Sequence, residues 1–260
     1  MSDAIFELDG DRAIPHPIAR GPWSDDAQHG GPPAALLARA LERADPGPAH
    51  FVARLTVELL RPVPIRPLTV ETRTLRPGRK VQWLEATLRA DDTVVARATA
   101  LRLRVDSGLA LPVPDPGPLA IAPPAEGSPY AIEFPTASVG FWQAVELRVA
   151  AGSFADVGAA TIWFRLAVPV VLGEEPTPLQ RVAVAADFGN GVSNALERGR
   201  YLFINPDLTI YLHRLPVGEW VALEARTHAE AGGVGLAESA LHDERGRIGR
   251  SLQSLLVDRL

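Results

Sequence analysis

The sequence predicts an α+β fold that is built twice from one unit, a helix followed by an antiparallel sheet. Three observations predict it: an internal repeat, a helix signal and runs of alternating apolar and polar residues. Residues 55–74 read LTVELLRPVPIRPLTVETRT, and residues 208–227 read LTIYLHRLPVGEWVALEART. The offset of 153 residues contains no gap, and it continues downstream of both stretches. A repeat at a fixed offset indicates a duplicated supersecondary unit.

The helix of the first unit is predicted at residues 29–44, HGGPPAALLARALERA. Two glycines precede the helical run, and two prolines suit its first turn, where backbone amides have no partner within a helix. Leucines and alanines then recur at helical spacing, which indicates one buried face. The helix of the second unit is expected near residues 180–197, with the sequence DFGNG as a break.

Alternating apolar and polar residues predict the strands of both units. Tight turns are expected at Asp91-Asp92, at Gly232-Gly233 and at residues 243–246. The predicted strand segments are 50–60, 68–76 and 81–105 in the first unit, and 141–150, 160–168, 204–214, 219–229 and 233–258 in the second.

Residues 108–136 contain eight prolines and separate the two copies. Proline at this density cannot join a central ladder and favours an extended spacer. We therefore predict an N-terminal unit at residues 1–107, a linker at 108–136 and a C-terminal unit at 137–260. One continuous sheet wrapped around both helices would cover the edge strand that each unit alone exposes. This arrangement is the double hot-dog fold.

Composition excludes several classes of function. The net charge of −5 argues against a nucleic-acid partner, and the lack of cysteine excludes disulfides and thiolate chemistry. The histidines show no metal-ligand spacing, so no metal is expected, and no other cofactor is expected either. No serine-hydrolase elbow is present, which argues against a serine hydrolase of the α/β type. We see no signal peptide and no run near the ~20 apolar residues of a membrane span, so we expect a cytoplasmic protein without a membrane partner.

Four stretches carry a family resemblance: W-x5-HGGPPAALLARAL (23–41), LLRPVP (59–64), RPGRKVQ (76–82) and NPDLTIYLHRLPVGEW (205–220). In this order they resemble the thioesterase-like double hot-dog proteins of actinobacteria, which are distant relatives of bacterial acyl-CoA thioesterase II. The resemblance extends over nearly the whole chain outside the linker. It implies an enzyme of lipid metabolism that hydrolyses acyl-CoA.

The resemblance also implies a catalytic group of an Asp, a Thr or Ser and a Gln, all on the second unit and holding one water. Asp207, Thr227 and Gln253 are the matching positions. Leu208 departs from the family, which commonly has a His after the Asp. The first unit has Arg54 opposite Asp207 in the repeat, so one active site per chain is expected.

Thioester hydrolysis needs an activated water and a stabilised oxyanion. Asp207 would act as the general base, while Thr227 and Gln253 would orient the water. Each residue also has a structural interpretation. Asp207 suits a turn at a strand end, Thr227 suits any half-buried strand, and Gln253 could be a satisfied polar residue on an apolar strand.

Substrate contacts are predicted at the start of the first helix and on nearby strands. The amides of Gly30 and Gly31 and the positive end of the helix dipole suit the thioester carbonyl. His29 either lines this site or has a structural role. The remaining predicted substrate-binding residues are Arg61, Arg79 and Lys80, which could meet the phosphates of coenzyme A, and Tyr211 and His213, which share strand parity with Asp207.

The function predicted from these residues is the hydrolysis of acyl-CoA thioesters, with acyl-CoA as the ligand and a homo-oligomer as the expected assembly. Two alternatives stay open. One is a non-catalytic acyl-CoA-binding or scaffold protein of the same fold. The other is a hot-dog enoyl-CoA hydratase, which the order Asn205-Pro206-Asp207 disfavours because those enzymes place the Asp before the Asn-Pro pair.

Overall fold

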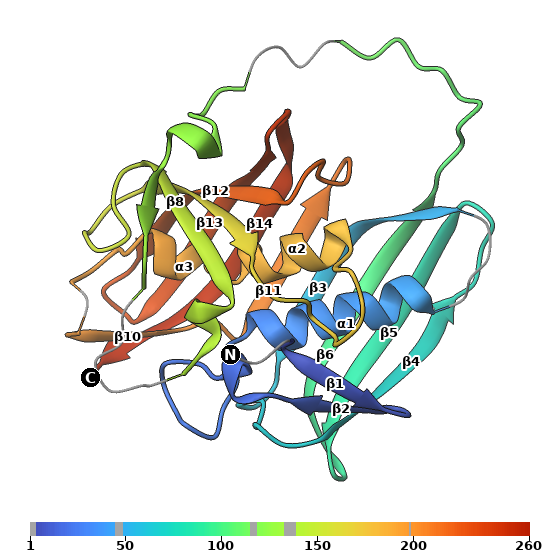
Figure 1. Cartoon of the computed structure of the whole chain (residues 1–260), viewed down its shortest axis with the longest axis horizontal. Helices are drawn as coiled ribbons and strands as arrows, with labels where there is room; N and C mark the ends of the chain where they lie inside the picture. The colour runs from blue at the N-terminus through green and yellow to red at the C-terminus, as the bar shows by residue number, and fades with distance from the viewer. Residues whose placement is uncertain (1–3, 45–48, 115–118, 133–138, 198) are drawn as a thin grey trace.

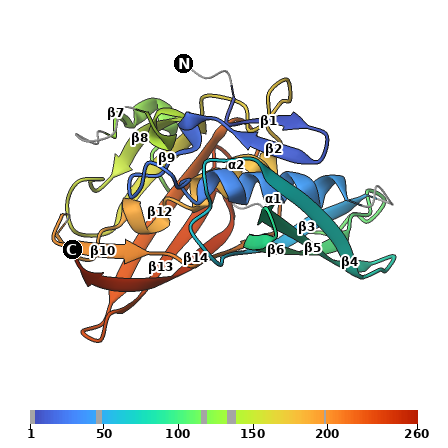
Figure 2. The same ribbon diagram turned by 90° about the horizontal axis from the view of Figure 1, so that it is seen from below.

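The computed structural model describes residues 4–44, 49–114, 119–132, 139–197 and 199–260. Within these residues, fourteen strands form one sheet with antiparallel pairing between neighbouring strands. Helices α1 and α2 lie inside the curve of this sheet (Figures 1 and 2). The α+β class and the double hot-dog architecture predicted from the sequence are confirmed.

The elements follow the predicted order. The helices are α1 (Gly31–Arg43), α2 (Pro178–Ala186) and the short α3 (Gly189–Val192). The strands of the first half are β1 (Phe6–Asp9), β2 (Arg12–Pro15), β3 (His50–Leu59), β4 (Leu68–Arg76), β5 (Val81–Ala90) and β6 (Thr93–Arg104). Those of the second half are β7 (Ser128–Tyr130), β8 (Val145–Ala151), β9 (Ala160–Leu166), β10 (Tyr201–Ile204), β11 (Asp207–Leu212), β12 (Trp220–Ala229), β13 (Val234–Asp243) and β14 (Gly246–Arg259).

Strands β3 and β11 join the two halves at the middle of the sheet. In their register Thr56 lies opposite Thr209, and the two side-chain oxygens are 3.3 Å apart. These residues are separated by 153 positions, which is the offset of the sequence repeat. Because Thr56 pairs with its own repeat equivalent, Thr209, an approximate twofold axis passes through this pair and relates the two halves.

One hydrophobic core serves both halves. Helix α1 contributes Leu36, Leu37 and Leu41, which are almost fully buried, and α2 contributes a face of valines and alanines. The two helices run antiparallel, because the start of α1 contacts Asp187 at the end of α2 and the end of α1 contacts the start of α2. Each helix therefore has its first residues beside the last residues of the other.

Four local features differ from the sequence-based expectation. The β1–β2 hairpin was not predicted, and residues 141–143, expected as a strand, form a 3-10 helix. The expected break falls between α2 and α3, but the second helix ends at Val192, and residues 193–197 are not helical. Strand β7 lies within the proline-rich stretch and joins the sheet at its edge, where proline is tolerated. Residues 115–118 and 133–136 of the predicted linker, and residues 137–138 of the predicted C-terminal unit, lie outside the described residues.

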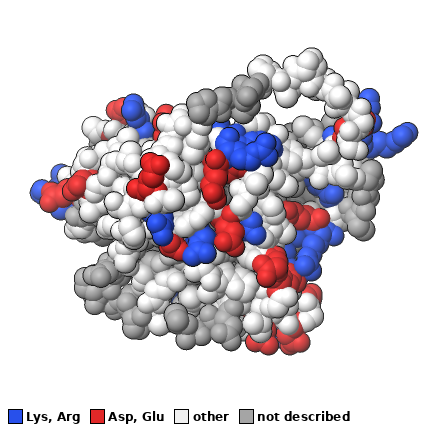
Figure 3. All heavy atoms as spheres, turned by 45° about the horizontal axis from the view of Figure 1, so that its top comes forward, with Lys and Arg blue, Asp and Glu red and all other residues white. Residues whose placement is uncertain are grey.

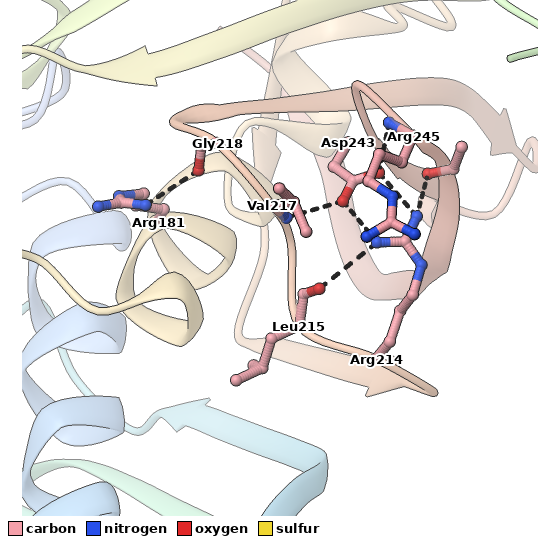
Figure 4. Close-up of polar contacts among 8 residues, drawn as sticks. Arg181, Arg214, Leu215, Val217, Gly218, Asp243 and Arg245 are labelled. Carbon is pink, nitrogen blue, oxygen red and sulfur yellow. Dashed lines mark hydrogen bonds and ion pairs between the residues drawn. The ribbon is translucent and has the colours of Figure 1, made fainter. Parts of the chain in front are cut away.

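A buried ion pair ties the β11–β12 loop to the β13–β14 hairpin (Figure 4). Asp243 has a fully buried side chain and accepts two hydrogen bonds from Arg214, the one to Oδ1 at 2.7 Å. The backbone amides of Val217 and Arg245 donate to the same carboxylate at 2.8 and 2.9 Å. Burial alone would raise the pKa of Asp243, but these hydrogen bonds outweigh burial and hold the pKa below its ordinary value.

Basic and acidic side chains are interspersed on the face shown in Figure 3. Many of them form surface ion pairs between neighbouring strands, such as Arg73 with Glu85 and Arg97 with Glu58. Within the described part of the chain, no helix is long and apolar enough to cross a membrane.

Candidate active site

The start of α1 and the end of α2 bring a buried acid, a histidine and an amide together. Asp187 follows the last residue of α2 and is only 4% exposed. Its Oδ2 lies 2.8 Å from Nδ1 of His29, and its Oδ1 accepts a hydrogen bond of 2.8 Å from the side chain of Asn205. A buried carboxylate is tolerated only when it is paired or hydrogen-bonded, and both oxygens of Asp187 meet this condition.

Gly30 allows α1 to begin against this carboxylate. A Cβ at Gly30 would lie 2.6 and 2.7 Å from the two carboxylate oxygens of Asp187. The backbone of Gly30 has a φ of −67°, which any residue can adopt, so the close approach and not the backbone conformation requires glycine. The predicted Gly30-Gly31 turn therefore lies at the site, in contact with an acid from the other half.

His29 is held by backbone hydrogen bonds on its N-terminal side. Its amide donates to Ala19 at 2.9 Å, and the preceding Gln28 donates from its backbone to Val63 at 2.7 Å and from its side chain to Pro64 at 2.8 Å. These bonds tie the loop before α1 to the segment after β3. The imidazole position is thus set by the first half, while its Asp187 partner comes from the second.

The first turn of α1 offers few amide donors. Pro32 and Pro33 have no N–H, and the amide of Ala34 donates to Gly30 within the helix at 3.1 Å. The amide of Gly31 is therefore the remaining donor of this turn, and it lies 3.2 Å from Nδ1 of His29. A carbonyl oxygen beside Gly31 would receive this hydrogen bond and the positive end of the α1 dipole.

Gln253 shapes the backbone that carries Asp187. Its side-chain nitrogen donates to the backbone oxygen of Asp187 at 3.2 Å, and its oxygen accepts from the amide of Asn190 at 3.1 Å. A Cβ at Gly189 would lie 2.6 Å from that oxygen, so glycine is required for this approach. Gln253 is 1% exposed, and it holds the turn between α2 and α3 from the neighbouring β14.

Aromatic rings surround the imidazole of His29. Its centroid lies 4.7 Å from that of Phe188 and 5.1 Å from that of Phe141, and Phe164 stacks on Phe188 at 4.8 Å. Phe141 and Phe164, which could have lined an acyl pocket, thus lie on the site side of the sheet. Trp163 belongs to the other face, where its indole N–H donates to Ala122 at 2.8 Å.

Asp207 and Gln253, two residues of the predicted catalytic group, lie on opposite faces of the sheet. In the β11–β14 register Thr209 lies opposite Leu252, which places Leu208 opposite Gln253. Side chains alternate along a strand, so Leu208 points to the core with Gln253, and Asp207 points to the outer face. There its Oδ1 accepts from the backbone amide of Ser254 at 2.8 Å.

Thr227 lies on the same face as Gln253, two strands away in one cross-strand row. Ala237 is the residue between them, opposite Thr227 on β12 and opposite Gln253 on β14. The hydroxyl of Thr227 lies 2.8 Å from that of Ser193, just after α3. No hydrogen bond among the described residues joins Thr227 to Asp187 or to Gln253, so Thr227 borders the α3 turn and not the carboxylate.

The predicted substrate-binding residues are spread over the sheet and do not form one cluster. Tyr211 and His213 share the outer face with Asp207, and Tyr211 is 48% exposed. Arg79 and Lys80 lie at the β4–β5 turn beside the start of β3, whereas Arg61 follows the end of β3. The ten residues of β3 span about 30 Å, so these cations cannot contact one phosphate group.

Arg61 alone of these cations lies near the site. The last residue of β3, Leu59, donates from its amide to Pro206 at 2.7 Å. Pro206 adjoins Asn205, whose side chain contacts Asp187. Two residues beyond Leu59, Arg61 is exposed and follows the same end of β3.

Sequence reasoning missed Asp187 and Asn205. A signal for Asp187 was present, because it is the single charged residue after five small or apolar residues, VAVAA, and before Phe188. A lone acid in an apolar helix end predicts either a buried functional carboxylate or a helix boundary. Among the described residues, no group of three or more His, Asp or Glu side chains could hold a metal ion.

Solved structures with the same architecture are thioesterase-like proteins. A putative thioesterase II from Thermobifida fusca YX has 20% sequence identity and a TM-score of 0.73, with 99% of this chain and 96% of that chain covered. A putative thioesterase from Novosphingobium aromaticivorans DSM 12444 has 18% identity and a TM-score of 0.72, with 97% and 98% covered. A tesB protein of Mycobacterium avium subs paratuberculosis has 17% identity and a TM-score of 0.64, with 97% and 95% covered. At these identities the similarity shows the hot-dog fold.

Family models extend this result to the sequence. A model described as the acyl-CoA thioesterase N-terminal domain matches residues 19–103, and one described as the acyl-CoA thioesterase C-terminal domain matches residues 114–257. The chain therefore belongs to the acyl-CoA thioesterase family. A search of curated proteins finds no match.

Proposed function

We propose that the protein hydrolyses acyl-CoA thioesters at the site around Asp187. One observation carries the proposal: a buried carboxylate of the second half meets the first turn of α1, which belongs to the first half and has an amide donor to offer. Membership of the acyl-CoA thioesterase family supports the same reaction. The repeat explains why one site forms per chain, since Ala100 and Val52 stand where Gln253 and Asn205 stand in the second half.

The chemistry divides between the two halves. The amide of Gly31 and the α1 dipole would stabilise the oxyanion that forms when water attacks the thioester carbonyl. Asp187, with its neighbours His29 and Asn205, would provide the basic group on which water activation depends. Gln253 would act as a positioning residue, because it contacts the backbone of Asp187 and not its carboxylate.

Arg61 is the cation that we assign to the phosphates of coenzyme A. It follows the end of β3 that contacts Pro206, next to Asn205, whereas Arg79 and Lys80 lie at the far end of β3. An Arg guanidinium suits a phosphate because it can donate two parallel hydrogen bonds. Arg61→Ala should therefore raise KM for acyl-CoA, while Lys80→Ala should leave it unchanged.

The test is thiol release from acyl-CoAs of short to long chain by wild type, Asp187→Asn and Asp207→Asn. Both variants replace one carboxylate by an amide, but the two residues lie on opposite faces of the sheet. We expect Asp187→Asn to lower kcat by ~10²–10⁴, the usual contribution of acid–base catalysis, and Asp207→Asn to keep nearly full activity. Loss of activity in Asp207→Asn, with Asp187→Asn active, would mean that the active site lies on the outer face of the sheet, at Asp207.

A non-catalytic acyl-CoA-binding protein is the second candidate. The observation that favours it is that both oxygens of Asp187 already have partners, as in a purely structural ion cluster. Such a protein would bind acyl-CoA and release no thiol at any chain length. Calorimetric binding of a non-hydrolysable acyl-CoA thioether, measured beside the release assay, separates the two functions.

A further inference from the structure

We infer that Nε2 of His29 is the atom that takes the proton from the attacking water, and that Asp187 is its positioning residue. This inference rests on the proposed hydrolase function and names the proton acceptor within that site. In the family resemblance drawn from the sequence, the base is an Asp. The contacts of Asp187 and His29 favour a different division of roles.

The first argument is the state of the Asp187 carboxylate. Its side chain is 3% exposed, and its oxygens are engaged by His29 at 2.8 Å and by Asn205 at 2.8 Å. Gly30 is packed against both oxygens, so close that a Cβ there would overlap them. A water has no open approach to this carboxylate. The His29 side chain is 18% exposed and is the accessible member of the pair.

The second argument is the arrangement of protons on the imidazole ring. Nδ1 of His29 lies 2.8 Å from Oδ2 of Asp187 and 3.2 Å from the amide nitrogen of Gly31. If Nδ1 carries a proton, it donates to the carboxylate, and if it carries none, it accepts from the amide. It cannot do both at once. The shorter, charge-assisted contact decides the tautomer, so Nδ1–H donates to Asp187 and Nε2 carries the lone pair.

This tautomer has a consequence for Gly31. Because Nδ1 is protonated, it cannot accept from the Gly31 amide, and the one N–H that α1 offers in its first turn is left for the thioester oxygen. The same hydrogen bond that turns the lone pair of His29 outward therefore also frees the oxyanion donor. The rings of Phe141 and Phe188, which stack on each other with centroids 5.8 Å apart, pack against the imidazole and hold it in this orientation.

The reaction balances without a further reactant. Water gives a proton to Nε2 of His29 as its oxygen bonds to the carbonyl carbon, and the carbonyl electron pair moves to the oxygen beside Gly31. The C–S bond then breaks, and the leaving thiolate takes the proton from Nε2. A base oriented by a buried carboxylate is the arrangement that hydrolases of other folds use.

The test is His29→Asn, because the Asn amide can occupy the place of Nδ1 and still donate to Asp187 while lacking a base. We expect kcat for acyl-CoA to fall ~10²–10⁴ with KM within a few-fold of wild type. His29→Ala should regain at least about tenfold activity with added imidazole, which would pack against the two phenylalanine rings, whereas Asp207→Asn and the exposed control His228→Asn should stay active without it. Thermal unfolding of each variant checks that it is folded.

Two results would overturn the inference. Near-normal kcat in His29→Asn, with Asp187→Asn inactive, would show that Asp187 itself takes the proton in a working hydrolase. A nitrogen NMR spectrum of wild type that places the ring proton on Nε2 would exclude the tautomer whether or not the protein is active. Absence of thiol release by wild type from every acyl-CoA is a different outcome, because it removes the hydrolase function and the inference falls with it.

Discussion

The two ends of the paired helices are built differently, although the repeat makes them equivalent. At the open end, Gly30 of α1 meets Asp187 after α2. At the capped end, Thr177 before α2 meets Glu42 of α1, and its hydroxyl donates to that carboxylate at 2.6 Å. Each end thus joins the start of one helix to an acid at the end of the other.

The difference lies in how each helix start satisfies its amides. Thr177 and Gln180 form a reciprocal capping box, with a hydrogen bond of 3.2 Å from the Gln180 amide to the Thr177 side chain. That helix start therefore has its donors occupied. The N-cap residue of α1, Gly30, makes no side-chain cap, and the Gly31 amide lies 3.2 Å from Nδ1 of His29. In the proposed mechanism this amide serves the ligand, so the duplicated scaffold would serve stability where the helix is capped and chemistry where it is not.

The largest expected effect comes from breaking the buried ion pair of Asp243 and Arg214, which supports the loop beside the capped end. Arg181, in the first turn of α2, donates to Gly218 in the loop that Asp243 anchors through Arg214 (Figure 4). Asp243→Asn leaves Arg214 without its buried partner and should cost about 3 kcal/mol of unfolding free energy, the low end for a buried pair because Arg214 is partly exposed. Urea unfolding measures the loss, and kcat per folded molecule should not change.

The same pair predicts how stability depends on pH. The pKa of Asp243 is lowered in the folded protein, so the ion pair contributes its full stability above the unfolded pKa of about 4. This contribution is lost as the pH falls through the lower, folded-state pKa. The stability difference between wild type and Asp243→Asn should therefore be constant near neutral pH and shrink below about pH 4. A difference that persists at low pH would contradict the role of the charged carboxylate.

The next largest effect is expected from a substitution at the open end, where Gly30 meets Asp187. Gly30→Ala places a Cβ within 2.7 Å of the Asp187 carboxylate, without backbone strain, and must displace it. A misplacement of about 1 Å costs on the order of 10² in rate, so kcat should fall by about that factor. Gly191→Ala is the matched control, because its Cβ meets nothing within 4 Å. Equal activity of both variants would mean that the position of Asp187 does not matter.

The smallest effect is expected from a substitution at the capped end, where Thr177 meets Glu42. Thr177→Ala removes the N-cap of α2 and the donor to Glu42, and should cost about 1 kcal/mol of stability. Because the capped end has no catalytic role in this account, kcat should remain at the wild-type value. Thermal unfolding and thiol release on the same preparation test both parts, and a loss of activity without a loss of stability would assign a function to this end.

Most of the fold follows from sequence pattern. The boundaries of β4 and the turn between β5 and β6 agree with the alternation of their residues, and the repeat offset is also the separation of Thr56 and Thr209, which pair at the centre of the sheet. The β1–β2 hairpin was missed because each strand has only four residues, too few to show a period. Residues 141–143 are apolar, and a short apolar run does not distinguish a strand from a helical turn.

Part of the proposed site was predicted. His29, Gly30 and Gln253 lie beside Asp187, and glycine before a helix and a polar residue on an apolar strand both had a physical reason. The predicted acid, Asp207, lies on the outer face of the sheet, away from Gln253. Leu208, Ile210 and Leu212 alternate with Asp207, and this alternation already indicates that Asp207 faces away from the core. The contact of Asp187 with His29 could not be predicted, since it depends on how two helices from separate halves meet.

The most direct test of the central claim compares the two acids at the two ends. Burial raises the pKa of Glu42, against a weaker opposing effect of its hydrogen bond from Thr177, and Glu42→Gln keeps an acceptor for that hydroxyl. Thiol release should fall ~10²–10⁴ in Asp187→Asn and stay within about twofold of wild type in Glu42→Gln. Loss of activity in Glu42→Gln, with Asp187→Asn active, would place the chemistry at the capped end and contradict the account.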